Sequence, residues 1–157
     1  MSRRLVWGLV AALVVTAGLA GAAWYVADRS TRAETARTDA LAAATAATQA
    51  IFSYDYRGFD ASVANGQQFV TGDFAKEYAS TTAGLKASAE KEKAIVRAEV
   101  SAAGVVESAT DRVEVLLYVN QYRRNANITG EKVDQNRVVL TLVPADGAWK
   151  VSHALAI

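Results

Sequence analysis

A small set of side chains in this sequence could perform acid-base chemistry. A carboxylate or imidazole in an apolar pocket, paired with a tyrosine donor, suffices for proton transfer next to a carbonyl group. The candidate residues, which include the single histidine of the chain, are Tyr54, Asp55, Tyr56, Tyr78, Tyr118, Asn120 and His153. Whether they form an active site depends on the elements that position them.

The segment SYDYRGFD, from Ser53 to Asp60, also has a structural interpretation as a corner between two helices. Arg57 suits a last helical turn, Gly58 supplies a left-handed residue that ends the helix, and Asp60 caps the next helix. We then expect Phe59 to fold back on the tyrosine at position 54, and the aspartate at 55 to pair with the arginine. This interpretation is favoured over catalysis.

The other candidates have structural interpretations too. Tyr54 and Tyr78 are expected to pack helix against sheet, with their hydroxyls at the rim. His153 is predicted to share a strand face with Trp149 and Val151, where it lines a cone or edges the core. The residues expected to line any pocket are therefore Tyr54, Asp55, Tyr78, Tyr118, Asn120, Trp149 and His153.

Composition excludes several other kinds of site. The chain has 157 residues, a 52% apolar composition, no cysteine and one histidine, so it can build a core but no disulfide, thiolate or His-rich metal site. A formal net charge of +1 with scattered Lys and Arg argues against a dedicated nucleic-acid binder. The sequence contains no phosphate loop, nucleophile elbow or EF-hand spacing. We therefore assign no catalytic residue, cofactor or metal.

The N-terminal region predicts a membrane anchor. After a short tail at residues 1–4, the uncharged run of residues 5–27 is long enough to cross a hydrocarbon core of about 30 Å. Arg3 and Arg4 place the tail in the cytoplasm and residues 28–157 outside the cell membrane. The alternative is a signal peptide cleaved after Ala20-Gly21-Ala22, which would give a secreted soluble domain.

Small residues recur four apart within this span and would let another helix approach closely. Because the whole chain is rich in alanine and glycine, chance spacing remains the alternative. The predicted contacts with a membrane partner are Gly8, Ala12, Ala17, Gly18, Gly21 and Ala22.

The exported part reads as helices followed by strands, which predicts an α+β domain with a curved antiparallel sheet around a long helix. Gly104 is a predicted bulge, Asp146-Gly147 a tight hairpin turn, and the polar segment from Arg123 to Gln135 a loop. The expected helices are residues 28–56, 61–69 and 71–93, and the expected strands are residues 95–107, 112–122, 136–144 and 149–157.

Several blocks, in order, resemble the Mce-associated membrane proteins of actinobacterial cell envelopes: SYDYRGFD, TGDFAKEY, AAGVV, DRVEVLLYVNQ, VDQNRVVLTLV and DGAWKVSH. The similarity runs from Leu41 to the end of the chain. It implies a single-pass membrane protein whose exported domain has the cone-shaped fold of nuclear transport factor 2 and ketosteroid isomerase. The chain departs from the family in its short tail, MSRR, and in His153, where an acidic residue is expected.

The resemblance further implies a non-enzymatic accessory role beside Mce transporters, which import lipids such as fatty acids and sterols. The expected partners are the permease and Mce proteins of such a complex, together with membrane lipid. The alternative is a lipid- or steroid-binding domain, isomerase-like or not, that uses its own apolar cone. The segment Arg123 to Gln135 is the predicted exposed contact with a partner.

Overall fold

A computed structural model describes the backbone of residues 3–157 and the side chains of residues 24–28 and 30–157. The chain divides into two compact units, Met1–Thr35 and Ala36–Ile157. Helix α1 runs from Arg3 to Phe52, and the predicted membrane span at residues 5–27 falls in the first unit of the chain. The expected partner contacts in that span, from Gly8 to Ala22, lie outside the described side chains. Among the residues that are described, no helix is long and apolar enough to cross a membrane.

In the second unit, α1 buries a stripe of small side chains. The sequence predicts an apolar face at Ala33, Ala36, Ala40, Ala44, Ala47 and Ile51, spaced three or four residues apart, and all of these except the half-exposed Ala33 are buried. The helix ends at Phe52, four residues before the predicted end. Ser53 leaves the helix because its Oγ accepts a hydrogen bond from the Ala98 backbone N–H at 2.9 Å.

The corner after α1 differs from its predicted form. Tyr54–Asp55 is a short strand, β1, followed by a 3-10 turn, η1 (Tyr56–Gly58), and helix α2 (Phe59–Gln67). Gly58 has φ −137°, so it is not left-handed, and it is the N-cap of α2 without a side-chain cap, so the predicted cap at Asp60 is wrong. Asp55 instead caps η1, where its Oδ1 accepts from the Arg57 N–H at 2.9 Å. The predicted contact of Phe59 with Tyr54 is confirmed, with ring centroids 5.5 Å apart.

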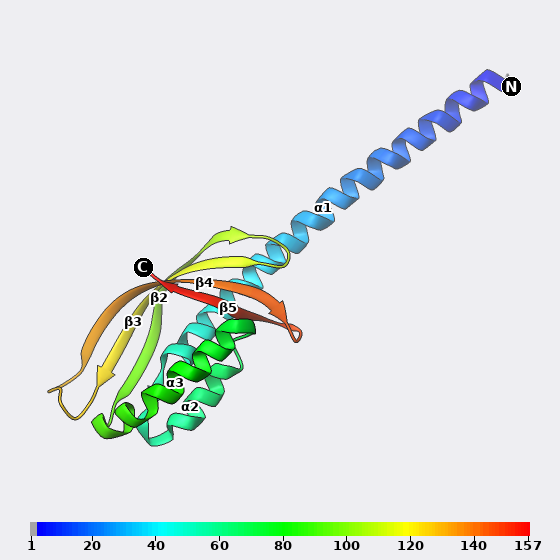
Figure 1. Cartoon of the computed structure of the whole chain (residues 1–157). Helices are drawn as coiled ribbons and strands as arrows, with labels where there is room; N and C mark the ends of the chain where they lie inside the picture. The colour runs from blue at the N-terminus through cyan, green and yellow to red at the C-terminus, as the bar shows by residue number, and fades with distance from the viewer. Residues whose placement is uncertain (1–2) are drawn as a thin grey trace. The chain divides into compact units, whose positions relative to one another are not determined.

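Helix α3 (Gly72–Glu92) follows Thr71, as predicted. Its last turn closes on Lys93, which has the left-handed φ of 53° and donates its backbone N–H to the carbonyls of Ala89 and Glu90. Tyr78 and Ala89 are its buried residues. Helices α2 and α3 contact each other and lie against one face of the sheet (Figure 1).

The sheet is a five-stranded antiparallel meander in the order β1-β2-β3-β4-β5, which confirms the α+β prediction. The strand beyond the predicted four is β1, which pairs with the start of β2. The longer strands are β2 (Ile95–Ser108), β3 (Val113–Arg124), β4 (Lys132–Ala145) and β5 (Ala148–Ala156). Their curvature wraps the sheet around the helices (Figure 1).

The inner face of the central strands forms the core, as the alternating pattern predicts. On β3 and β4 the side chains of Val113, Val115, Leu117, Leu140 and Leu142 are fully buried. These strands also extend further than predicted. Their hairpin loop spans only residues 125–131, because Arg123 pairs with Lys132 across the strands and its side chain binds Asp134 at 2.9 Å.

Bulges change the predicted faces of two strands. In β2 the register shifts lie at Ser101 and Val106, while Gly104 pairs regularly with Leu116, so the predicted bulge at Gly104 is wrong. In β5, Thr141 of β4 opposes His153 and Leu142 opposes Val151, which leaves Ser152 as the extra residue. The Asp146-Gly147 turn is confirmed, with φ values of 52° and 78°.

The bulge at Ser152 overturns the predicted face of β5. An extra residue shifts the alternation of side chains by one position. Val151 therefore points into the core and Ala154 follows it there, whereas His153 and Leu155 are exposed. The histidine does not share a face with Val151.

Candidate functional site

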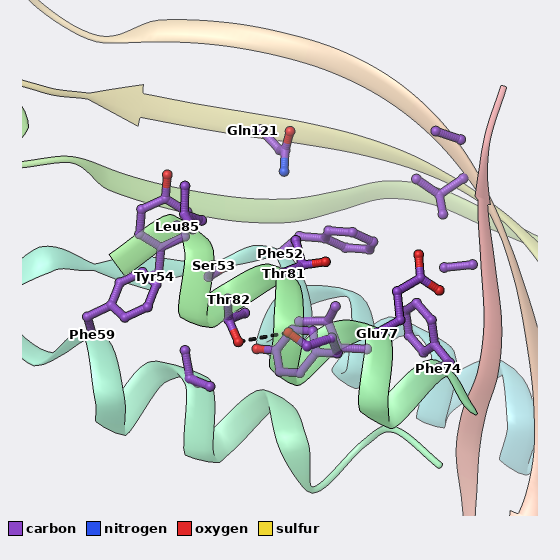
Figure 2. A pocket seen from close by; sticks show the side chains of 16 residues that line it. Phe52, Ser53, Tyr54, Phe59, Phe74, Glu77, Thr81, Thr82, Leu85 and Gln121 are labelled. Carbon is purple, nitrogen blue, oxygen red and sulfur yellow. Dashed lines mark hydrogen bonds between the residues drawn. The ribbon is translucent and has the colours of Figure 1, made fainter. Parts of the chain in front are cut away.

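A cavity of about 350 Å³ opens between the helices and the sheet in the unit Ala36–Ile157. Its walls come from the end of α1, Tyr54 of β1, two side chains of α2, the stretch of α3 from Phe74 to Leu85 and the strands β3, β4 and β5 (Figure 2). Most of the lining side chains are apolar, including Phe52, Val63, Phe74 and Leu85. This volume falls within the usual range of small-molecule pockets, roughly 300–1,000 Å³.

The helices position one wall of this cavity. The end of α1 brings Ile51 and Phe52 to the cavity before the chain turns into β1. On α3, Phe74 and Tyr78 lie one turn apart and share a face, because residues four apart in a helix are neighbours. Leu85 continues that face two turns later and closes the end near Tyr54 and Phe59.

The sheet forms the opposite wall with shorter side chains. Because the bulge at Ser152 reverses the alternation of β5, Ala154 and Ala156 line the cavity, next to Val138 of β4. Alanine side chains extend only one carbon from the backbone, so they leave open the space that a leucine at these positions would fill. The bulge and the two alanines therefore account for part of the hollow.

Few polar groups reach the cavity. Gln121 of β3 accepts a hydrogen bond at its Oε1 from Asn136 Nδ2 at 2.9 Å, and its amide nitrogen points to the cavity side (Figure 2). Thr82 Oγ1 donates to the Tyr78 carbonyl at 2.8 Å, which occupies that hydroxyl within α3. Glu77 is the charged side chain among the described lining residues.

Both tyrosines of the cavity are held in their protonated form. Burial raises the pKa of Tyr78. Burial also raises the pKa of Tyr54, where Glu92 adds to the effect and Arg123 opposes it. A raised phenol pKa keeps the neutral hydroxyl at physiological pH, so both groups can act only as hydrogen-bonding hydroxyls there.

Tyr78 also packs the cavity floor against α2. A Cβ placed on Gly66 would lie 2.1 Å from the Tyr78 hydroxyl oxygen and 3.1 Å from the Ala50 carbonyl oxygen. Only glycine allows this approach, because any side chain would collide with the phenol. Gly66 therefore joins α1, α2 and α3 beneath the cavity.

The structure brings together only part of the predicted site. Tyr54 and Tyr78 line the cavity. Asp55 lies outside it and pairs with Arg57, whose hydrogen bonds hold the pKa of the Asp55 carboxyl below its usual range. Tyr56 begins η1 beside this ion pair.

The remaining predicted residues lie on other surfaces. Tyr118 and Asn120 line a separate, polar hollow of about 290 Å³ on the outer face of the sheet, together with Gln135 and Arg137. His153 is exposed and Trp149 follows the β4–β5 turn, and neither lines the cavity. Asp55, His153 and the tyrosines thus do not share one site.

Glu77 and Gln121 are cavity residues that sequence reasoning missed, although each left a signal. Glu77 follows Phe74 by three residues, so it carries a charge onto the apolar face of α3. Gln121 continues the series Val113, Val115, Leu117 and Val119, so it places an amide at an inner-face position. A polar residue that interrupts an apolar period is the general sign of such a site.

No protein-family profile matches the sequence. The chain is 29% identical, over 148 residues, to an uncharacterized protein of Mycobacterium tuberculosis that is recorded in strains CDC 1551 and H37Rv. The aligned region covers 92% of this chain and 67% of that protein.

Solved structures share the fold at low sequence identity. An IcmL-like type IV secretion system protein of Legionella pneumophila is 16% identical, with a TM-score of 0.64, and covers 77% of this chain and 91% of its own. CagV, a VirB8 homolog of the type IV secretion system of Helicobacter pylori, is 10% identical, with a TM-score of 0.60 over 74% of this chain and 94% of its own.

A periplasmic fragment of TraM is 14% identical, with a TM-score of 0.58 over 76% of this chain and 95% of its own. Likeness at these identities concerns the fold and not the function. It confirms the predicted class, helices packed on a curved antiparallel sheet as in nuclear transport factor 2-like domains.

Proposed function

We propose that this chain is a non-enzymatic accessory protein of the cell envelope, whose domain at residues 36–157 is exported and binds other proteins of a membrane complex. The observation that carries the proposal is the fold shared with the periplasmic fragment of TraM and with the type IV secretion system proteins. The dispersal of Asp55, Tyr118 and His153 over separate surfaces supports a role in binding rather than catalysis.

The complex we propose is an Mce-type lipid importer in the cell membrane. Support comes from the blocks SYDYRGFD to DGAWKVSH and from the similarity to a mycobacterial protein, which fits an actinobacterial envelope family. In this proposal, residues 5–27 anchor the chain beside a permease, with residues 1–4 in the cytoplasm. The domain then contributes surface, and no cofactor or metal takes part.

Native purification tests this proposal. The full chain with a C-terminal tag is purified in a gentle detergent, and the proteins recovered with it are identified by mass spectrometry. The control is the tagged segment 1–35, which keeps the proposed anchor and lacks the second compact unit. We expect permease and Mce subunits with the full chain, and a clear depletion of the Mce subunits with the control, which keeps the segment proposed to lie beside the permease. Recovery of the full chain without either subunit would contradict the proposal.

The cavity favours a second function, the binding of an apolar ligand. Its 350 Å³ volume and its lining by Phe52, Phe74 and Leu85 fit a hydrocarbon body. Isomerisation of such a ligand is not part of this proposal, since the Asp55 carboxyl lies outside the cavity and is paired with Arg57. An accessory domain of a lipid importer could then hold the cargo class that its complex carries.

A further inference from the structure

Two polar side chains enter the apolar cavity from opposite walls. Glu77 projects from α3 and Gln121 projects from β3, and the Phe52 ring lies between them in Figure 2. Among the described side chains, none forms an ion pair or hydrogen bond with the Glu77 carboxylate. The Oε1 of Gln121 is occupied by Asn136, whereas no described group accepts from its Nε2. Glu77 therefore offers an unused acceptor and Gln121 an unused donor, next to the hydroxyls of Tyr54, Tyr78 and Thr81.

The charge of Glu77 decides which headgroups suit the cavity. No Lys, Arg or His is present among the described residues that line it. A fatty-acid carboxylate could accept from Gln121 Nε2, but it would lose hydration on entry and meet the like charge of Glu77, with no cation in the described lining to offset that charge. The lining thus disfavours the anionic form of a fatty acid.

The amide of Gln121 determines which of the remaining classes of headgroup can bind in the cavity. An alkylammonium group could bind Glu77, but it has hydrogen-bond donors only and cannot accept from Gln121 Nε2. Covering that N–H with hydrocarbon would leave a donor unpaired, which is costly in a dry site. A hydroxyl donates to Glu77, and a carbonyl or hydroxyl oxygen accepts from Gln121, without any net charge.

We infer that the cavity binds an uncharged, hydroxylated amphiphile, such as a monoacylglycerol, and selects it against fatty-acid anions and alkyl amines. Its hydroxyls would donate to Glu77, its ester carbonyl would accept from Gln121, and its acyl chain would contact Phe52, Phe74 and Leu85. This inference rests on the ligand-binding function proposed for the cavity and adds the class of ligand.

The test uses ligands of one chain length that differ only in the headgroup: monopalmitoylglycerol, palmitate and hexadecylamine. The full chain is titrated with each ligand at pH 7.5, and the bound fraction is measured by native mass spectrometry. We expect monopalmitoylglycerol to bind about tenfold more tightly than either charged ligand, a difference of about 1.4 kcal/mol.

Variants assign the selectivity to its residues. Glu77→Lys should raise the affinity for palmitate about tenfold, because it replaces the like charge with an opposite one. Glu90→Lys makes the same charge change on the same helix, away from the cavity lining, and should leave all three affinities unchanged. Gln121→Leu should weaken monopalmitoylglycerol about fivefold and strengthen hexadecylamine by a similar factor, because the donor that the amine leaves unpaired is gone.

A further variant locates the binding site. Ala156→Phe places a ring at the cavity wall from an exposed position near the end of β5, so it should block all three ligands without unfolding the domain. Circular dichroism of this variant checks that the fold is kept.

The outcomes separate the two levels of the proposal. If none of the ligands binds the wild-type chain, or if Ala156→Phe folds and still binds them, the ligand-binding function of the cavity fails. If the ligands bind in the cavity with equal affinity, or if Glu77→Lys has no more effect than Glu90→Lys, the binding function stands and the inference on ligand class is overturned.

Discussion

The layer between helices and sheet is filled in one part and hollow in another. In the filled part, fully buried Leu117, Leu140 and Leu142 of the sheet belong to one core cluster with Ala40 and Ala44 of α1. Small side chains on the helix there meet large ones on the sheet, so the two surfaces close without a gap. In the hollow part this matching fails.

Around the cavity, the sheet contributes the short side chains of Ala154 and Ala156, and α3 places the exposed side chains of Glu77 and Thr81 among its apolar ones. Short side chains on one surface and hydrated ones on the other leave the space between them open. The same layer therefore stabilises the domain where large and small side chains of helix and sheet are matched, and leaves a cavity where they are not.

Truncation of a leucine should lower the free energy of unfolding most in the filled part of the layer. Leu140→Ala removes a fully buried side chain, and we expect it to lower the free energy of unfolding by about 2–5 kcal/mol. Leu85→Ala removes the same atoms beside an existing cavity, so its cost should be only about 1 kcal/mol. Urea denaturation of both full-chain variants measures the two values. Equal losses would show that the cavity wall is packed as tightly as the core.

Adding a methyl group should have opposite effects at two helix glycines. Gly66→Ala would drive its Cβ into the Tyr78 phenol, and we expect a loss of about 1–3 kcal/mol in the free energy of unfolding. Gly84→Ala is the matched control, because nothing lies within 4 Å of its added Cβ within α3. Alanine there should stabilise the domain by about 0.5–1 kcal/mol. Thermal unfolding distinguishes these signs, and a stabilising Gly66→Ala would contradict the described contact.

The Asp55–Arg57 ion pair, which lies outside the cavity, should contribute least to the free energy of unfolding. Asp55→Asn keeps a side-chain acceptor for the Arg57 N–H but removes the charge that pairs with the guanidinium. Because the arginine is exposed, we expect a loss below about 1 kcal/mol at pH 7. No change in ligand affinity should accompany it, since the residue does not line the cavity.

The pH dependence of that small loss has a definite sign. Arg57 lowers the pKa of Asp55 in the folded state. The stabilisation of the folded state by the ionised Asp55 is therefore fully present above the unfolded-state pKa of about 3.9. It disappears as the pH falls through the lower folded-state pKa. Unfolding midpoints of the wild type and Asp55→Asn should differ at pH 6 and converge in strong acid. A difference that grows on acidification would contradict the assigned ion pair.

Most of the fold could be predicted from local patterns. The alternation from Val113 to Val119 and the small-residue period from Ala36 to Ile51 each placed one buried face correctly. The errors lie where pairing with a distant strand decides the structure. Ser53 leaves its helix to bind Ala98, and the bulge at Ser152 exists only in the register of β5 against β4.

The site was less predictable than the fold. Tyr54 and Tyr78 were expected at a pocket and line one, whereas Tyr118 and Asn120 face a different hollow on the other side of the sheet. Strand parity alone could have separated these two pairs, because Tyr118 lies between the buried residues Leu117 and Val119. Glu77 and Gln121 could have been found in the same way.

Local sequence patterns specify the α+β class, the buried faces of the central strands and the tight turn at Asp146-Gly147, because each depends on periods or backbone preferences within a few residues. The tertiary structure places Asp55 outside the cavity and brings Glu77 and Gln121 into its lining from different elements. Those relations depend on strand register and on the pairing of side-chain sizes between layers, which no local pattern encodes.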